Sequence, residues 1–166
     1  GRQENMNPVK EQIARITNPR EIQGGLKDVL IGADVFIGVS SGNLLEPKDL
    51  SVMESNSIVF ALSNPNPEVN PWLALDYAQI VATGRSDFPN QINNALVFPG
   101  LFKGVLDARA RKITREMRLA AASAIASLIP DDELADQNII PGIFNKNVCP
   151  AVASAVANAA AFSGGL

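Results

Sequence analysis

Hydrophobic and polar positions along this chain alternate between strand-like and helix-like segments. Three short apolar runs have the β-rich composition and the length of buried parallel strands. They are DVFIGVS at 34–40, SIVFALSNP at 57–65 and QIVATG at 79–84. Because helix-like segments separate these runs, the sequence predicts an α/β fold with a parallel sheet of the doubly wound type, followed by C-terminal helices.

The first predicted helix lies in NPVKEQIARIT, at 7–17. Asn7 can cap it, and Val9, Ile13 and Ile16 share one of its faces. The pattern predicts that the helix ends just before Pro19, since a residue that precedes proline avoids the helical region.

Two short helices, in GGLKDVLIG at 24–32 and EPKDLSVMESN at 46–56, are expected to turn apolar residues inward. Leu26, Val29 and Leu30 face inward in the first of them, and Leu50 and Met53 in the second. The other predicted helices cover 71–78, 99–110, 113–129 and an alanine-rich terminal segment that starts near Pro150.

Small polar residues follow each of the three predicted strands. Residues 38–42 (GVSSG) follow the first, residues 63–65 (SNP) the second, and the loop GRSDFPNQINN at 84–94 the third. In doubly wound sheets ligands bind at the carboxyl ends of the strands, so these loops are expected to form one ligand-binding edge. Glycine, serine and asparagine are also ordinary turn residues, but their recurrence after three consecutive strands favours a site.

Two adjacent asparagines, Asn93 and Asn94, stand between the third strand and the next predicted helix. A carboxamide both donates and accepts hydrogen bonds, so it can hold a carboxylate or a ribose hydroxyl without adding charge. Two arrangements are open: both side chains contact a ligand, or one binds it while the other fixes the loop. Within the same loop, Asp87 can cap a turn and Arg85 can be a solvated charge.

Composition narrows the function classes without naming a reaction. A net charge of −3 and a pI of about 4.9 argue against a nucleic-acid partner. The single cysteine, Cys149, excludes an internal disulfide, and no apolar run is long enough to span a bilayer. Without histidine, the sequence offers no evident nucleophile–base pair or His/Cys metal cluster, and no G-x-G-x-x-G follows a predicted strand.

Three blocks of the sequence carry a resemblance to a known family. They are GADVFIGVSSGNLL at 32–45, IVFALSNPNPEVNP at 58–71 and IVATGRSDFPNQINNALVFPGLFKGVLDARARKIT at 80–114. In this order they resemble the carboxyl-terminal half of the malic enzyme family in its bacterial-type form. The resemblance covers nearly the whole chain, and the block ATGRSDFPNQINN-x-x-x-FPG at 82–100 is highly specific.

The resemblance implies an oxidoreductase that oxidatively decarboxylates malate to pyruvate and CO2, with NAD or NADP and with Mg2+ or Mn2+. It assigns the malate and nicotinamide site to the asparagine of the SNP motif and the pair before FPG, here Asn64, Asn93 and Asn94. It also implies that the strand end Gly38-Val39-Ser40, together with Asn64, passes along the dinucleotide.

The family's tyrosine acid, lysine base, acidic metal ligands and glycine fingerprint correspond to sequence upstream of Gly1. Residues 1–166 are therefore expected to be the C-terminal part of a dinucleotide-binding domain, a partial Rossmann-like sheet flanked by helices, plus C-terminal helices. The first βαβ unit and the N-terminal catalytic domain are expected to be absent from these residues. Residues 1–166 are therefore expected to contain no catalytic residues or metal ligands and to be inactive on their own. Such a sheet is expected to expose an apolar edge at DVFIGVS.

The intact enzyme is expected to be a homo-oligomer, a dimer. The single cysteine fits a reducing compartment, so the enzyme is expected in the cytoplasm, and the charge and the short apolar runs argue against nucleic-acid and membrane partners. Two alternatives stay open. One is another NAD(P)-dependent oxidoreductase domain with a similar sheet, against which the 84–94 block argues. The other is a non-catalytic nucleotide-binding or oligomerisation module with the same fold.

Cofactor choice depends on the first predicted helix, near which this fold reads the 2′ position of the adenine ribose. Lys10 resembles the family position at which a lysine accompanies NADP use, and Arg2 is a second candidate. Glu4 is an acid that could serve NAD instead. On this basis the sequence favours NADP.

Overall fold

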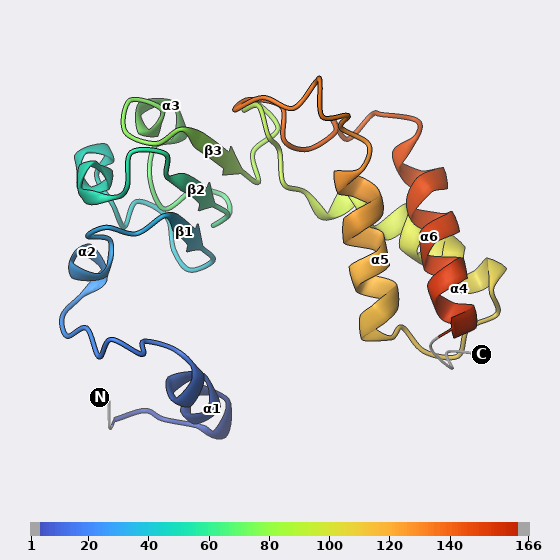
Figure 1. The fold of residues 1–166 in the computed structure, drawn as a ribbon, viewed down its shortest axis with the longest axis horizontal. Helices are drawn as coiled ribbons and strands as arrows, with labels where there is room; N and C mark the ends of the chain where they lie inside the picture. The colour runs from blue at the N-terminus through green and yellow to red at the C-terminus, as the bar shows by residue number, and fades with distance from the viewer. Residues whose placement is uncertain (1–3, 163–166) are drawn as a thin grey trace.

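The sheet has three short parallel strands. The computed structural model describes residues 4–162 and places β1 (Val35–Gly38), β2 (Ile58–Ala61) and β3 (Ile80–Thr83) side by side in the order β1-β2-β3. The predicted strands are therefore confirmed. All three strands point the same way (Figure 1), so their carboxyl ends meet at one edge.

Helices and short helical turns connect and follow the strands. They are α1 (Pro8–Ile16), α2 (Leu26–Val29), the 3-10 helix η1 (Pro47–Val52), α3 (Pro71–Ala74), the 3-10 helix η2 (Asn94–Leu96), α4 (Phe98–Asp107), α5 (Arg115–Ala126) and α6 (Val148–Phe162). The predicted helix at 46–56 is thus a 3-10 helix, and the terminal helix begins at Val148, two residues before Pro150. No helix among residues 4–162 is long and apolar enough to cross a membrane.

One face of the sheet carries the first hydrophobic core. Phe36, Val59 and Val81 are register partners on this face, and all three are buried. The predicted inward residues Leu50 and Met53 pack into the same core, as does Leu30. This core fixes the sheet and therefore the positions of the loops that follow its strands.

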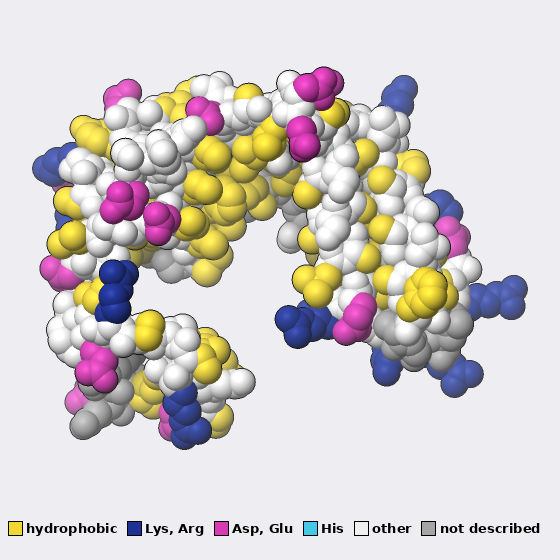
Figure 2. All heavy atoms as spheres, viewed as in Figure 1, with side chains coloured by type: hydrophobic (Ala, Val, Ile, Leu, Met, Phe, Trp, Pro, Cys, Tyr) yellow, Lys and Arg dark blue, Asp and Glu magenta, His cyan; other side chains and the backbone are white. Residues whose placement is uncertain are grey.

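The opposite face of the sheet is partly open at β1. Val35 and Ile37 on β1 are 48% and 60% exposed, and their register partners Ile58 and Phe60 are only half-buried. Figure 2 shows hydrophobic side chains gathered over the strands. The predicted apolar exposure at DVFIGVS is therefore present among the described residues, because β1 is also the edge strand.

The N-terminal segment packs less than its pattern predicts. Val9, Ile13 and Ile16 share a face of α1 but remain exposed, and α1 lies apart from the sheet (Figure 1). On α2, the predicted inward residues Leu26 and Val29 are also exposed. A periodic apolar face predicts that a helix forms, but it does not say which neighbour covers that face.

A second hydrophobic core joins α4, α5 and α6. Gly100 and Gly104 let α4 approach α6 closely, since a Cβ at Gly104 would lie 2.5 Å from the carbonyl oxygen of Ala153. Val152 and Val156 fill the space opposite these glycines and are fully buried. The three helices stand beside the sheet in Figure 1.

A buried asparagine links the sheet to the loop that precedes α6. Asn90 is 6% exposed and has a left-handed backbone (φ 57°). Its Nδ2 donates to the carbonyl oxygens of Val81 (3.2 Å) and Asp136 (2.8 Å), and its Oδ1 accepts from the Ile139 N–H (2.9 Å). These bonds hold residues 136–139 against β3.

Candidate functional site at the carboxyl edge of the sheet

The strand ends lie in register at one edge. Gly38 on β1 pairs with Ala61 on β2, which pairs with Thr83 on β3. The loops predicted to form a ligand site therefore leave the sheet at neighbouring points. This is the edge at which ligands bind in open α/β sheets.

The loops after β1 and β2 are fastened to each other by backbone hydrogen bonds. The N–H of Asn43 donates to the Pro67 carbonyl oxygen (2.8 Å), and the N–H of Leu45 donates to that of Glu68 (2.9 Å). Asn43 adopts a left-handed backbone (φ 57°), and the Asn64–Pro65 peptide bond is cis. Residues 43–45 and 67–68 thus form one connected rim along the edge.

The predicted cofactor-contacting residues of β1 differ in exposure. Gly38 is buried inside the sheet, whereas Val39 is 77% exposed and Ser40 is also exposed. Val39 and Ser40 can therefore meet a ligand directly. Gly38 instead provides space, because a Cβ there would lie 2.4 Å from Cδ of the buried Glu68.

The loop after β3 returns to the sheet before it reaches the asparagine pair. The N–H of Ile92 donates to the Thr83 carbonyl oxygen (2.8 Å), which sets Gln91 and Thr83 side by side. Asn93 and Asn94 follow directly, so this contact anchors the chain just before them at the strand edge.

The three predicted substrate asparagines have different surroundings. Asn93 caps η2, because its Oδ1 accepts the N–H of Ala95 at 2.9 Å. Asn64 and Asn94 are exposed, and neither side chain makes a hydrogen bond within residues 4–162. Asn64 and Asn94 can therefore offer a complete carboxamide to a ligand, while Asn93 fixes the loop.

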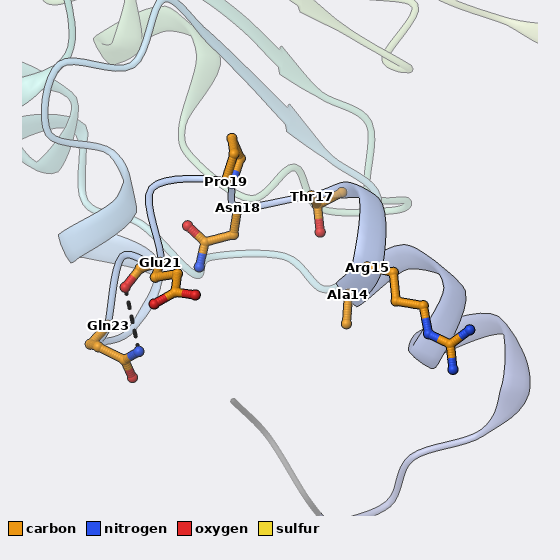
Figure 3. A pocket seen from close by; sticks show the side chains of 7 residues that line it. All are labelled: Ala14, Arg15, Thr17, Asn18, Pro19, Glu21 and Gln23. Atoms are coloured by element: carbon orange, nitrogen blue, oxygen red, sulfur yellow. Dashed lines mark hydrogen bonds between the residues drawn. The ribbon is translucent and has the colours of Figure 1, made fainter.

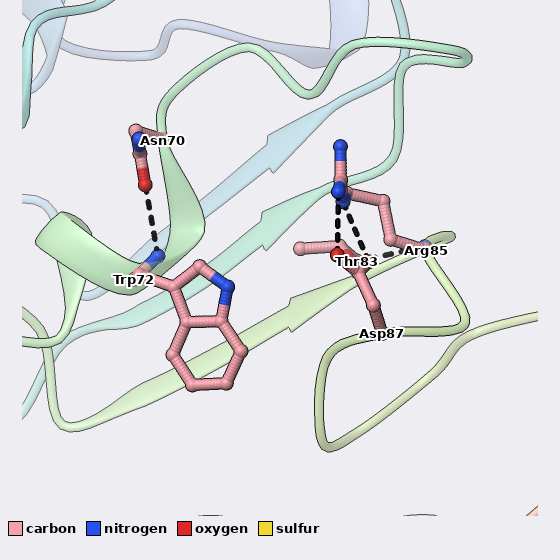
Figure 4. Close-up of polar contacts among 5 residues, drawn as sticks. All are labelled: Asn70, Trp72, Thr83, Arg85 and Asp87. Atoms are coloured by element: carbon pink, nitrogen blue, oxygen red, sulfur yellow. Dashed lines mark hydrogen bonds and ion pairs between the residues drawn. The ribbon is translucent and has the colours of Figure 1, made fainter.

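The charged residues of the same loop pair with each other. The guanidinium of Arg85 makes two hydrogen bonds to the Asp87 carboxylate, and the Arg85 N–H donates to Thr83 Oγ1 (Figure 4). The hydrogen bond from Arg85 lowers the pKa of Asp87, and Asp87 raises the pKa of Arg85. Asp87 therefore closes the Arg85 turn by an ion pair.

A cavity of about 230 Å³ lies where the three loops meet. Asn43 follows β1, Asn66 follows β2 and Arg85 follows β3, and all three line it. The N-terminal turn of α3 closes the cavity through Asn70, whose Oδ1 accepts the N–H of Trp72 (3.1 Å; Figure 4). Its amides and single cation suit a polar, anionic group, although Asn64, Asn93 and Asn94 do not line it.

Two further hollows are not lined by residues from all three of these loops. One of about 600 Å³ lies between α1 and residues 17–23 (Figure 3), and all of its lining side chains are exposed. Another, of about 420 Å³, lies between residues 86–91 and residues 137–145. The first is lined by no residue that follows a strand, and the second, of the three loops, only by the one after β3, so the cavity where three loops meet is the better candidate site.

The family follows from comparison with known proteins. The family described as "Malic enzyme, NAD binding domain" matches residues 2–161, almost the whole chain. The chain belongs to the malic enzyme family. The malic enzyme resemblance of the three sequence blocks and the partial Rossmann-like α/β fold are thereby confirmed.

Individual malic enzymes are similar over nearly the whole chain. An NAD-dependent malic enzyme of Geobacillus stearothermophilus is 53% identical over 93% of the chain, and an NADP-dependent one of Rhizobium meliloti is 42% identical over 99%. A crystal structure of malic enzyme from Pyrococcus horikoshii is 45% identical over 95% of the chain, with a TM-score of 0.86. The matched regions make up 32%, 23% and 37% of these proteins, so this chain spans well under half of their length.

The lysine predicted to select NADP lies on α1 and not on the loops that follow the strands. Lys10 is exposed on α1, where its Nζ donates to the Asn5 carbonyl oxygen (2.8 Å). The second candidate, Arg2, lies outside the described residues.

Within residues 4–162, no group of three or more His, Cys, Asp or Glu side chains could hold a metal ion.

Sequence reasoning missed the most deeply buried charged group of this edge, Glu68. It is fully buried between two buried neighbours, Pro67 and Val69. Its sequence signal is a lone acid within the proline-rich turn NPNPEVNP, which also fits a solvated turn residue. Asn90 was equally hidden, because its partners Asp136 and Ile139 lie more than forty residues away in the sequence.

Proposed function

We propose that this chain forms part of the nicotinamide and malate site of a malic enzyme that oxidatively decarboxylates malate to pyruvate and CO2. One observation carries the proposal. In a chain of this family, the exposed carboxamides of Asn64 and Asn94 follow neighbouring points of one sheet edge and make no hydrogen bond within residues 4–162. Such groups bind a carboxylate or hydroxyl without adding charge.

The residues of the edge fit a dinucleotide. Ser40 and Asn64 are exposed hydrogen-bonding residues that follow adjacent strands, and Val39 adds exposed apolar surface beside them. Ribose hydroxyls need hydrogen-bonding groups, and the flat nicotinamide ring needs apolar surface. We assign Gly38, Val39, Ser40 and Asn64 to the cofactor-binding site. Gly38 contributes indirectly, because its lack of a side chain leaves room for Glu68.

Asn64 and Asn94 would orient malate, and Asn93 would hold the loop that presents Asn94. Holding the substrate in a reactive geometry is a positioning contribution, which can account for a large part of a rate enhancement. Val39, Ser40 and Asn64 would hold NAD or NADP, which would supply the hydride acceptor for C2 of malate. Mg2+ or Mn2+, with ligands from outside residues 4–162, would supply Lewis-acid stabilisation.

We propose three further properties of the enzyme. Its preferred cofactor is NADP, and Lys10 recognises the 2′ position of the adenine ribose. The working enzyme is a homodimer. It acts in the cytoplasm, where the unpaired thiol of Cys149 stays reduced.

The test is turnover by the full-length protein that carries this chain. With malate, Mg2+ or Mn2+ and either NAD or NADP, we expect absorbance at the reduced-nicotinamide band to rise together with an equimolar amount of pyruvate. Chelation of the metal should stop both. Reduced cofactor without pyruvate would indicate a different dehydrogenase, and no reduction of either cofactor would contradict an enzymatic role.

A further inference from the structure

Glu68 bridges the ends of two strands with one buried carboxylate. Its Oε1 accepts the backbone N–H of Ser40 (2.9 Å), and its Oε2 accepts the backbone N–H of Ser63 (3.1 Å). Gly38 and Ala61, the last residues of β1 and β2, pair in register, and each serine lies two residues beyond one of them. The carboxylate therefore contacts equivalent points on both loops.

Glu68 is buried, and Gly38 leaves the space that its side chain occupies. An ionised carboxylate away from water is strongly unfavourable unless hydrogen bonds satisfy it, yet Glu68 is fully buried. Gly38 makes the room, since a Cβ there would lie 2.4 Å from Glu68 Cδ and 2.7 Å from Oε1. A buried acid and a glycine are thus fitted to each other at the edge where the ligand loops begin.

The partners of Glu68 explain why the side chain is an acid. Both partners are N–H donors, so the bridge needs two acceptor oxygens. A glutamine of the same shape would offer one acceptor and one NH2 donor, which would face one of the two N–H groups. Only a carboxylate of this length satisfies both loops at once.

We propose that Glu68 is a positioning residue, which fixes the loops of Ser40 and Ser63 relative to each other and so presents the carboxamide of Asn64 at the ligand edge. Asn64 follows Ser63 directly, so a shift of the Ser63 backbone moves the Asn64 side chain. The same segment holds the rim residue Leu45 through the Glu68 carbonyl oxygen. This inference rests on the proposed function for its kinetic consequence, and on the structure alone for the anchoring.

Amide hydrogen exchange tests the anchoring in the full-length protein. In Glu68→Gln, we expect exchange to rise by roughly tenfold or more in peptides covering 39–42 or 62–65, because charge-assisted hydrogen bonds are lost. Peptides over β2 should stay protected. The control is Glu54→Gln, an exposed glutamate just before β2, which should leave all of these rates unchanged. Unchanged exchange at both serine loops in Glu68→Gln would overturn the inference, whatever the substrate.

A second variant keeps the test decisive if Glu68→Gln does not fold. Gly38→Ala retains the charge but places a methyl group against Glu68 Cδ, so it should displace the carboxylate and raise exchange in the same two peptides. Unchanged exchange in a folded Gly38→Ala protein would also contradict the bridge.

A double-mutant cycle tests the link to Asn64. Glu68→Gln should lower kcat/KM for malate by roughly tenfold, mainly through KM, and should have little further effect when Asn64 is already alanine. Fully additive losses would show that Glu68 does not act through Asn64. Wild-type protein that does not turn over malate would contradict the proposed function only, since the exchange result would still decide the anchoring.

Discussion

Asn93 and Asn94 are neighbours in the sequence with different local roles. Asn93 caps η2 through the Ala95 N–H, whereas Asn94 makes no side-chain hydrogen bond within residues 4–162. Losing an N-cap costs about 1 kcal/mol, so Asn93→Ala should lower the unfolding temperature of the full-length protein. Asn94→Ala should leave that temperature nearly unchanged. Equal shifts in the two variants would contradict this assignment, and thermal unfolding followed by circular dichroism measures both.

The Arg85–Asp87 ion pair predicts that the stability of the fold depends on pH in the acidic range. Because Arg85 lowers the pKa of Asp87 in the folded protein, this pair stabilises the fold above the unfolded pKa of about 3.9. The contribution is lost as pH falls through the lower folded pKa. Both side chains are more than a third exposed, so the effect on stability is small. A carboxyl titration by NMR should show the pKa of Asp87 rising in Arg85→Gln, and an unmoved pKa would show that the ion pair is absent in solution.

Lys10 carries the prediction on cofactor choice. If this exposed lysine reads the 2′-phosphate of NADP, Lys10→Gln should lower kcat/KM for NADP and leave kcat/KM for NAD nearly unchanged. Lys27→Gln is a matched control, since Lys27 is exposed and pairs with Asp49 instead. An unchanged ratio of the two kcat/KM values in Lys10→Gln would remove Lys10 as the discriminating residue.

At this scale the sequence predicts candidate ligand residues better than it predicts their supports. Glycine, serine and asparagine after a strand are visible locally, so the residues of the edge could be named. Glu68 and Asn90 could not, since each is defined by burial and by partners from distant segments. Nor could local pattern decide which of Asn93 and Asn94 caps the following helix.

At the scale of elements, the contact of α4 with α6 depends on close backbone approach. A Cβ at Gly104 would lie 2.5 Å from the Ala153 carbonyl oxygen and 2.8 Å from Val156 Cβ. Gly104→Ala should therefore destabilise the full-length protein by about 1–3 kcal/mol, although alanine is the better helix former. Gly142→Ala is the control, because a Cβ there meets no atom within 4 Å. Denaturant unfolding that shows Gly104→Ala to be as stable as wild type would refute the tight α4–α6 packing.

The elements themselves were largely predictable, because period and punctuation are local signals. Strands and helices lie within a few residues of their predicted positions. The errors concern burial: Leu26 and Val29 on α2 were expected inside and are exposed. Amphipathic spacing tells which residues share a face, but the neighbour that covers this face is set by the tertiary arrangement.

At the scale of the whole molecule, two hydrophobic cores determine where the loops at the carboxyl edge of the sheet lie. The first supports the three strands and the second unites α4, α5 and α6. Asn90 fastens residues 136–139, which precede α6, to Val81 of β3. The loop that carries Asn93 and Asn94 runs between these two bodies (Figure 1), so its placement depends on both.

The central claim is that the exposed carboxamides at this edge bind malate. The most direct measurement is kcat/KM for malate in the full-length protein and in its Asn64→Ala and Asn94→Ala variants, with Asn158→Ala on the exposed face of α6 as control. Losing a hydrogen bond to a charged substrate group costs about 1.5–3 kcal/mol, so each of the two variants should lose roughly ten- to a hundredfold. The control should match wild type. Wild-type kcat/KM in folded Asn64→Ala and Asn94→Ala would contradict the account.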